Sequence, residues 1–479
     1  MSATEDRTAR GLPPLAGLCT IEEAAKPGLS VEECVRRLKR YHYAFKRLHE
    51  IFIARLTAEP LYELKTLFAH HAWLCAEHVS ALRQRVGEMR EPPLGLEAVP
   101  DANLEIIFDE ILAAPTTEEL LNGVYGVAVE DLMLAVEDHR RVTNPLADAP
   151  TVRWCRFAAL ELRDMYRAGW VALEALAPDG LTDAADDWVN LVLREGLQFA
   201  GGFAGSATPP GEPVARQYSA SPYTYDPVPQ RDERFPDPYN MGVNAEAFLY
   251  DPEMPADAKT LMLLYKRLRE IDVPEMMASI IHQTRGKPWD YYRDMTRQLW
   301  DEARHAMMGE VGFAALGIDW PKFVAVNFNW SLALNTQLGP KERHAVLYFI
   351  EQGLMPRTGK RYEWEVATAS HNPLAATFQD YDWADEVLHS RIGRAWYVDA
   401  DFAGDAHAAG QFGDACWNKV YLDWNNVRER GLTRHRNWWP DLYREACRLS
   451  GVEPDPRALA FEETYEKTRA DLKDVSASG

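Results

Sequence analysis

The sequence predicts an all-α protein composed of two helical bundles in tandem, and three observations lead to this fold class. Apolar residues recur at spacings of three and four, and nothing in the first half alternates as a half-buried strand would. A segment rich in Pro and Tyr, residues 205–257, separates two helical halves. The tetrapeptide Asn-Pro-Leu-Ala occurs at 144–147 and again at 372–375, as expected for a duplicated bundle.

Length and composition limit the functional classes. A chain of 479 residues with 47% hydrophobic content is long enough for two or three cores. A formal charge of −21 argues against a nucleic-acid partner, because phosphate binding needs a basic surface. We find no secretory leader and no apolar run long enough to span a bilayer, so we expect a cytoplasmic protein without a membrane partner. The six scattered cysteines are expected to be reduced thiols.

The first half is expected to be helical from residue 29 onward. Residues 1–28 show little periodicity and are expected to form an N-terminal arm. Residues 29–204 are expected to form the first bundle. Its helices are expected at 31–56, 61–90, 101–113, 117–141, 151–177 and 182–199.

The second half begins after the connection at 205–257, which is expected to pack across a protein surface. A flexible linker would contain more Gly and Ser and fewer aromatic residues. Residues 258–432 are expected to form the second bundle, and residues 433–479 a helical tail. The second bundle's helices are expected at 258–284, 288–316, 319–335, 341–354, near 380–398 and 413–430.

Two copies of one motif indicate a metal site in the second bundle. Residues 301–305 (Asp-Glu-Ala-Arg-His) and 385–389 (Asp-Glu-Val-Leu-His) contain the only Glu-x-x-His matches in the chain. On a helix, residues three apart project from one face, so Glu302 with His305, and Glu386 with His389, can each bind one ion. A second copy with the same preceding Asp is rarely a coincidence.

A dinuclear carboxylate site in a helical bundle also needs one Glu from each of two further helices. Glu351 lies 35 positions before Glu386 on an otherwise apolar helix face. An unpaired carboxylate buried there would be costly, so Glu351 is expected to be a ligand.

Glu270 and Glu275 are both candidates for the remaining ligand. Glu270 lies 16 residues before Gly286 and Glu302 lies 16 after it, so antiparallel helices would place these two side by side. Helical phase instead favours Glu275, which lies on the apolar stripe. Pro274 makes phase unreliable here, so we favour Glu270 slightly and keep both.

The candidate ligands resemble those of a known superfamily. In chain order they are Glu270 or Glu275, Glu302, His305, Glu351, Glu386 and His389. Over roughly residues 258–400 this order resembles the ferritin-like di-iron carboxylate superfamily, and the doubled motif is similar to its p-aminobenzoate N-oxygenase branch. The resemblance implies two ferritin-like bundles, of which the first is degenerate. It also implies two iron ions, with manganese or a mixed iron–manganese pair as alternatives.

The resemblance implies roles for the ligands and a reaction class. Glu302 and Glu386 would bridge the ions and are the candidate catalytic residues, whereas His305 and His389 would each bind one ion. With O₂ as co-substrate, the expected enzyme is an oxidoreductase, an N-oxygenase or hydroxylase of a small molecule, as in secondary metabolism. No flavin fingerprint or cysteine cluster is present, so the electrons are expected from an external donor such as a separate reductase, from peroxide or from the substrate itself. A homodimer is a further expectation. The alternative is a non-catalytic scaffold or metal-binding protein with a vestigial site.

The first bundle is expected to be a degenerate copy without metal. Aligning the halves places acids at four ligand positions, namely Glu77, Glu110, Glu130 and Glu161. Ala113 and Asp164 occupy the two histidine positions. A variant metal site stays open because of four nearby histidines, His70, His71, His78 and His139.

Neighbouring charged residues are expected to support the second bundle's site. Asp301 and Asp385 would each accept the distal N–H of the facing histidine, or else lie on the surface. Arg304, Arg391 and Arg394 would form salt bridges, which we favour, or receive a carboxylate substrate.

Overall fold

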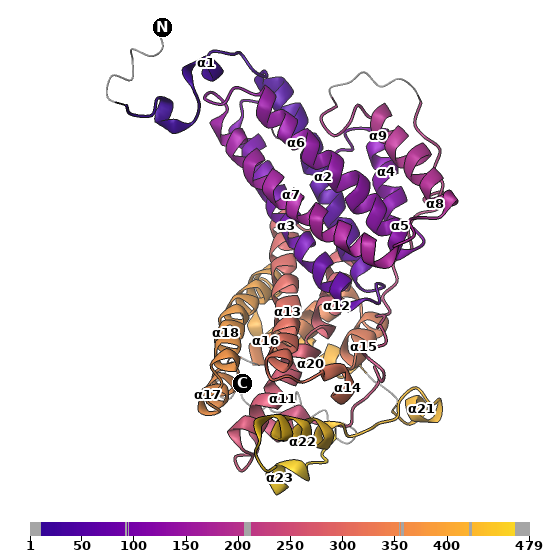
Figure 1. Cartoon of the computed structure of the whole chain (residues 1–479), viewed down its shortest axis with the longest axis vertical. Coiled ribbons are helices and arrows are strands. Elements are labelled where there is room, and N and C mark those ends of the chain that lie inside the picture. Colours follow the sequence, from indigo (N-terminus) through magenta and orange to yellow (C-terminus); the bar gives the residue numbers. More distant parts are fainter. Residues whose placement is uncertain are drawn as a thin grey trace. The chain divides into compact units, whose positions relative to one another are not determined.

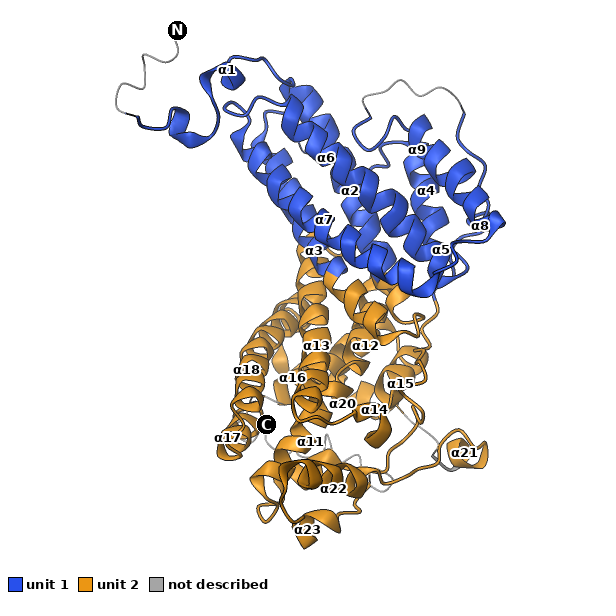
Figure 2. Cartoon of the chain, in the orientation of Figure 1, with its two compact units in different colours: residues 1–52, 71–225 blue, residues 53–70, 226–479 orange. Residues whose placement is uncertain are grey.

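The chain is all-helical wherever its structure is described. The computed structural model describes residues 11–91, 93, 95–205, 212–353, 355, 359–420 and 424–464, and these contain helices, turns and loops but no strand (Figure 1). They form two compact units, unit 1 from residues 1–52 and 71–225 and unit 2 from residues 53–70 and 226–479 (Figure 2). The all-α class is therefore confirmed, and the ferritin-like arrangement stays a prediction. Residues 53–70, expected in the first bundle, belong to unit 2.

Unit 1 contains most of the first-half helices near their expected bounds. They are α1 (Ile21–Ala24), α2 (Val31–Leu56), α3 (Tyr62–Glu88), α4 (Ala102–Leu112), α5 (Thr117–Leu121), α6 (Glu130–Val142), α7 (Ala149–Leu176), α8 (Asp183–Trp188) and α9 (Glu195–Phe199). Wide helical turns, η3 (Asn122–Val129) and η4 (Val189–Arg194), join α5 to α6 and α8 to α9. The end of α2 and the beginning of α3 lie in unit 2.

Unit 2 contains the helices that carry the candidate ligands. They are α10 (Ala245–Tyr250), α11 (Ala256–Arg269), α12 (Asp272–Gln283), α13 (Trp289–Ala315), α14 (Trp320–Phe323), α15 (Asn329–Gln337), α16 (Pro340–Gly353), α17 (Lys360–Ala369), α18 (Pro373–Gly393), η5 (Arg394–Asp399), α19 (Ala400–Phe402), α20 (Ala406–Trp417), α21 (Trp424–Glu429), α22 (Trp439–Ser450) and α23 (Pro456–Leu459). Around the ligands, α13 packs against α11 and α18, and α18 packs against α16 and α17.

Four expected helices of unit 2 have different bounds. The one expected near 380–398 begins at Pro373 as α18 and continues into η5. The helix expected at 258–284 breaks at Glu270, which is the C-cap of α11, and Pro274 lies in the first turn of α12, where a missing N–H is tolerated. The helix expected at 319–335 is interrupted at 324–328. The helix expected at 413–430 is two helices, α20 and α21. We did not expect α17, and part of the expected C-terminal helix lies outside the described residues.

Glycine allows α13 to approach α11 closely. A Cβ at Gly309 would lie 2.3 Å from the backbone nitrogen of Leu268 and 2.5 Å from the carbonyl oxygen of Leu264. Gly312 likewise faces the Leu264 side chain, at 2.3 Å. These glycines fix the spacing of the helix that carries Glu302, because no larger residue fits between the two backbones.

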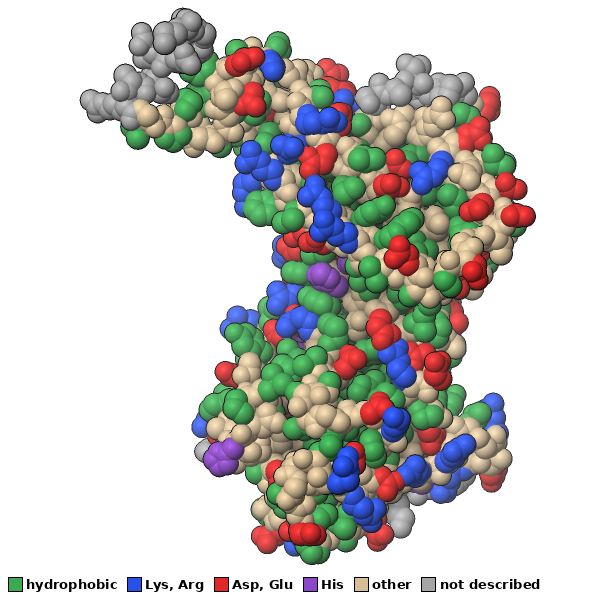
Figure 3. Space-filling model, in the orientation of Figure 1, with side chains coloured by type: hydrophobic (Ala, Val, Ile, Leu, Met, Phe, Trp, Pro, Cys, Tyr) green, Lys and Arg blue, Asp and Glu red, His purple; other side chains and the backbone are tan. Residues whose placement is uncertain are grey.

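The surface of each unit is mixed in character. On the face that Figure 3 shows, acidic, basic and hydrophobic side chains are intermingled. Exposed apolar side chains on α7 include Phe157, Leu160 and Val171. Among the helices that the structure describes, none is both long enough and apolar enough to cross a lipid bilayer.

Candidate metal centre

Four helical segments of unit 2 bring six expected ligands together. Glu270 ends α11, α13 carries Glu302 and His305, α16 carries Glu351, and α18 carries Glu386 and His389. We define the His389 position as the group of Glu302, Glu351, Glu386 and His389, whose ligand atoms lie within 4.8 Å of one another. The His305 position consists of two groups that share His305. One group also contains Glu270 and Glu302, and the other also contains Asp382 and Glu386.

Glu302 lies between the two imidazoles. Its Oε1 is 3.1 Å from Nδ1 of His389, and its Oε2 is 3.5 Å from Nδ1 of His305. Glu386 Oε2 is 3.6 Å from His389 Nδ1, and Glu270 Oε2 is 3.5 Å from His305 Nδ1. Each imidazole therefore presents Nδ1 to the carboxylates, and the two oxygens of Glu302 face different imidazoles.

The residues fit a pair of metal ions because their inward atoms have no hydrogen-bond partner. Those buried atoms are Oε2 of Glu270, Oε2 of Glu351, Oε2 of Glu386, Oδ2 of Asp382, Nδ1 of His305 and Nδ1 of His389. Buried polar groups are normally paired, so six such atoms at one centre call for an explanation. Carboxylate and imidazole donors are the set that binds iron and manganese in helical bundles.

The outer nitrogens of the imidazoles contact aspartates in a crossed arrangement. His305 Nε2 lies 3.2 Å from Asp385 Oδ2, and His389 Nε2 lies 3.4 Å from Asp301 Oδ2. These contacts, which the sequence suggested, orient both rings with Nδ1 inward. Arg304 pairs with both aspartates, at 2.7 Å from Asp385, which agrees with the salt-bridge interpretation.

The other two arginines near the motifs lie away from this centre. Arg391 and Arg394 are both exposed, on α18 and at the beginning of η5. They therefore neutralise none of the buried ligands directly.

Three buried charged residues at the centre were not expected. Asp382 lies one turn before Glu386 on α18, and the helical phase of α18 could have revealed it. Lys360 Nζ lies 2.9 Å from Asp382 and 2.8 Å from Glu386. Arg267 pairs with Asp382 and, at 2.8 Å, with Glu270. No pattern in the sequence predicted the two cations. Lys360 lies on α17, a helix that was not expected, and only the acidic residues in and after α11 were considered as ligands.

Burial and neighbouring charge shift the pKa values at the centre. Burial raises the pKa of Glu270, but Arg267 and Lys360 outweigh it and lower that pKa to about 2. Burial and the neighbouring Glu386 raise the pKa of Glu351 well above its usual value. Burial raises the pKa of Asp382 to about 6.

Both imidazoles also titrate away from their usual range. Burial lowers the pKa of His305 and His389, but the surrounding carboxylates outweigh it and raise both values well above normal. An ion that binds at Nδ1 requires that nitrogen to be unprotonated, so metal binding would be coupled to proton release.

Glu275 lies outside the centre, in a different buried ion-pair network. Its carboxylate pairs with Arg231 and, at 2.8 Å, with Lys65, and it accepts a hydrogen bond from Ser331. The side chain is completely buried. The structure thus brings Glu270, rather than Glu275, beside His305.

In unit 1 the four aligned acids lie apart. Glu110 accepts hydrogen bonds from the backbone N–H groups of residues 217–219, from the Ser219 hydroxyl and from the Trp188 indole. Glu161 pairs with His78 at 2.7 Å, Glu130 pairs with Arg194, and Glu77 is exposed. Among the residues described in unit 1, these acids form no common group of possible metal ligands.

The four histidines considered for a variant site also have separate surroundings. His70 stacks on Trp300 within unit 2, and His71 Nδ1 lies 2.8 Å from the hydroxyl of Tyr125. His78 pairs with Glu161, and of the four histidines only His139 belongs to a group of three possible ligands among the described residues.

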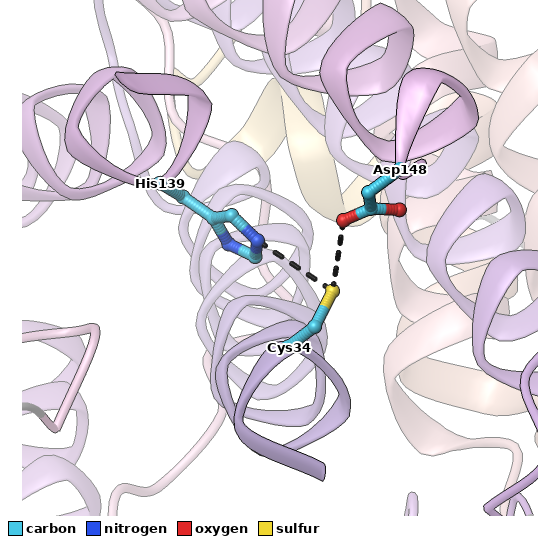
Figure 4. Close-up of side chains that lie close together, drawn as sticks. All are labelled: Cys34, His139 and Asp148. Atoms are coloured by element: carbon cyan, nitrogen blue, oxygen red, sulfur yellow. Dashed lines mark hydrogen bonds between the residues drawn. The ribbon is translucent and has the colours of Figure 1, made fainter. Parts of the chain in front are cut away.

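His139 belongs to a compact group with Cys34 and Asp148 (Figure 4). The Cys34 thiol donates to Asp148 Oδ2 at 3.3 Å, and its sulfur lies 3.6 Å from His139 Nε2. Asp148 also pairs with Arg85 at 2.8 Å and accepts a hydrogen bond from Thr143. Burial, followed by Asp148, raises the pKa of the thiol to about 12. The facing atoms already have protein partners, so this group is a hydrogen-bonded link between α2, the end of α6 and the beginning of α7.

Comparison with known proteins gives no relative from which a role could be transferred. No family model, no curated protein and no solved structure matches the chain. The functional argument therefore depends on the geometry and chemistry of the centre in unit 2.

Proposed function

We propose that unit 2 is a dinuclear metal oxidoreductase that activates O₂ to oxygenate a small molecule, as an N-oxygenase or hydroxylase. The observation that supports this proposal is the convergence of six buried atoms without hydrogen-bond partners, from four carboxylates and two imidazoles. Two ferrous ions, when bound, would supply electrons for O₂ that side chains lack. The donor set would also accept manganese or a mixed pair.

The chain's own residues would hold and protect this centre. Glu302 and Glu386 would contribute to both positions, and Asp301 and Asp385 would keep the imidazoles oriented. The side chains of His305 and His389 are completely buried, so bulk water is excluded from them. Such a dry site strengthens every electrostatic interaction within it.

The approach of a substrate is most direct beside Glu270. Its side chain is 16% exposed, against 3% for Glu302 and 2% for Glu386. The break between α11 and α12 places Glu270 at this edge of the centre. A small molecule would therefore reach the His305 position first.

A second candidate function is a non-catalytic scaffold. The observation that favours it is the burial of Lys360 and Arg267 among the carboxylates, where they neutralise part of the charge without any metal. A buried network of this kind can be purely structural.

Anaerobic iron binding followed by exposure to O₂ distinguishes the two. The oxidoreductase should bind ferrous iron, consume O₂ with a reductant and develop a transient near-ultraviolet or visible band. His389→Ala should abolish the band, because it removes the nitrogen donor of one position. A matched control is His344→Phe, which alters a buried histidine of the same unit outside the centre. If the wild-type ferrous protein does not react with O₂ in the presence of candidate substrates and a reductant, the protein is a non-catalytic scaffold.

A further inference from the structure

A lysine lies at one of the two metal positions. Lys360 is the first residue of α17 and its side chain is completely buried. Its ammonium group contacts Asp382, Glu386 and, at 3.6 Å, Glu270. In each of these carboxylates the other oxygen is a buried atom without a hydrogen-bond partner. The ammonium group therefore shares the carboxylates of the His305 position.

The His389 position is formed differently. Glu302 lies against the two imidazoles, and Glu351 accepts a hydrogen bond from the neutral amide of Gln298 at 2.9 Å. The Gln298 amide carries no charge. Glu386, which both positions share, contacts Lys360 through Oε1, whereas its Oε2 lies 3.6 Å from His389 Nδ1. An ion at the His389 position could therefore use the Glu386 oxygen that does not contact the ammonium group.

Direct repulsion makes the His305 position the harder of the two to fill. An ion bound there would share Asp382 and Glu386 with the ammonium group of Lys360. Like charges a few ångströms apart in a buried site repel strongly.

We propose that the two positions are inequivalent. The His389 position binds a divalent ion directly, whereas Lys360 competes with the second ion at the His305 position. The second ion binds when the ammonium group leaves Asp382 and Glu386, and Asp382 then becomes an additional carboxylate ligand. This inference rests on the proposed function, and it makes Lys360 the residue that determines whether the centre holds one ion or two.

Titration with Mn²⁺ tests the proposal without any turnover. In calorimetry the wild-type protein should bind two ions in separate steps whose affinities differ by at least about tenfold. Electron paramagnetic resonance should show an isolated ion at one equivalent and a coupled pair only at excess Mn²⁺. Lys360→Met keeps an unbranched side chain that is one atom shorter and removes its charge, so the second step should strengthen by at least about tenfold.

Lys65→Met is the matched control, because Lys65 is equally buried in unit 2 but pairs with Glu275 outside the centre. It should leave both steps unchanged. Two steps that stay equally separated in Lys360→Met, or equal affinities in the wild-type protein, overturn the inference and leave the metal centre intact. If Lys360→Met does not fold, equal affinities in the wild-type titration would still overturn the inference. Failure of the wild-type protein to bind either Mn²⁺ or Fe²⁺ overturns the proposed function as well.

Discussion

At the scale of single residues, a short pattern predicted four of the candidate ligands, and position along the helices predicted Glu351 and, by a slight preference, Glu270. Glu302 with His305 and Glu386 with His389 share a helical turn, so spacing alone places each pair on one face. The choice between Glu270 and Glu275 depended on phase across Pro274. The structure ends α11 at Glu270, which resets the phase, and no pattern in the sequence marks that break.

The first prediction separates these two glutamates. Glu270→Ala should lose the ion at the His305 position while the protein stays folded, because a side chain at the partly exposed edge is removed. Glu275→Ala should instead destabilise the protein by about 3–5 kcal/mol, because Lys65 and Arg231 lose a buried partner. Metal analysis and urea unfolding of both variants measure the two effects. Metal loss in Glu275→Ala with unchanged stability would show that this assignment is reversed.

A second prediction at this scale concerns acid stability. Burial lowers the pKa of His344 to about 4 from an ordinary value of about 6.5. Between these two pH values the ring binds a proton in the unfolded chain but not in the folded protein. The stability from this residue is complete above pH 6.5 and declines as pH falls toward 4. Between pH 7 and pH 5 the loss should be about 2 kcal/mol.

Substitution of His344 by Phe isolates this contribution. The ring lies 6.0 Å from Tyr291 and 5.7 Å from Tyr397, contacts that an aromatic replacement can keep. Urea unfolding at the two pH values should show a shallower pH dependence in His344→Phe than in the wild-type protein. Parallel pH dependences would mean that His344 does not titrate as described.

At the scale of helices, hydrophobic periodicity predicted where helices occur better than it predicted where they are interrupted. The long helices at 31–56, 149–176 and 289–315 agree closely with the expected ranges, because each carries a sustained apolar face. The interruption at 324–328 and the short helix α17 were missed, since a few residues provide too little periodicity. Lys360 is the first residue of α17, so this buried cation was not predicted because the helix that carries it was not predicted.

The third prediction tests the contact between α11 and α13. Gly309→Ala should destabilise the protein by about 1–3 kcal/mol, because its Cβ would collide with the backbone of Leu264 and Leu268. Displacement of α13 should also weaken metal binding, since His305 lies one turn before Gly309. Gly410→Ala, a helical glycine with nothing within 4 Å of its Cβ position, should stabilise the protein by up to about 1 kcal/mol. Equal effects of the two substitutions in thermal unfolding and metal analysis would refute the close-packing argument.

At the scale of the whole molecule, three of the four acids in unit 1 that align with the candidate ligands have structural partners. They are Glu110, Glu130 and Glu161. Glu110 anchors the backbone at 217–219, and Glu161 pairs with His78. Sequence alignment could place acids at equivalent positions, but it could not show where their side chains point, because a carboxylate that binds backbone amides and one that binds metal look the same in sequence.

The last prediction follows from these positions. Introducing both missing histidines, as Ala113→His with Asp164→His, should not raise the iron content of the protein. Asp164 is 65% exposed and pairs with Arg167 on the outer face of α7, whereas Ala113 caps the end of α4, so the two imidazoles would not converge on the acids. The measurement is iron per chain after anaerobic loading, with the His389→Ala variant as background so that uptake by unit 2 is reduced. A gain of one or more ions in the double variant would mean that α4 and α7 still present facing ligand positions, and that unit 1 lost its metal through the histidines alone.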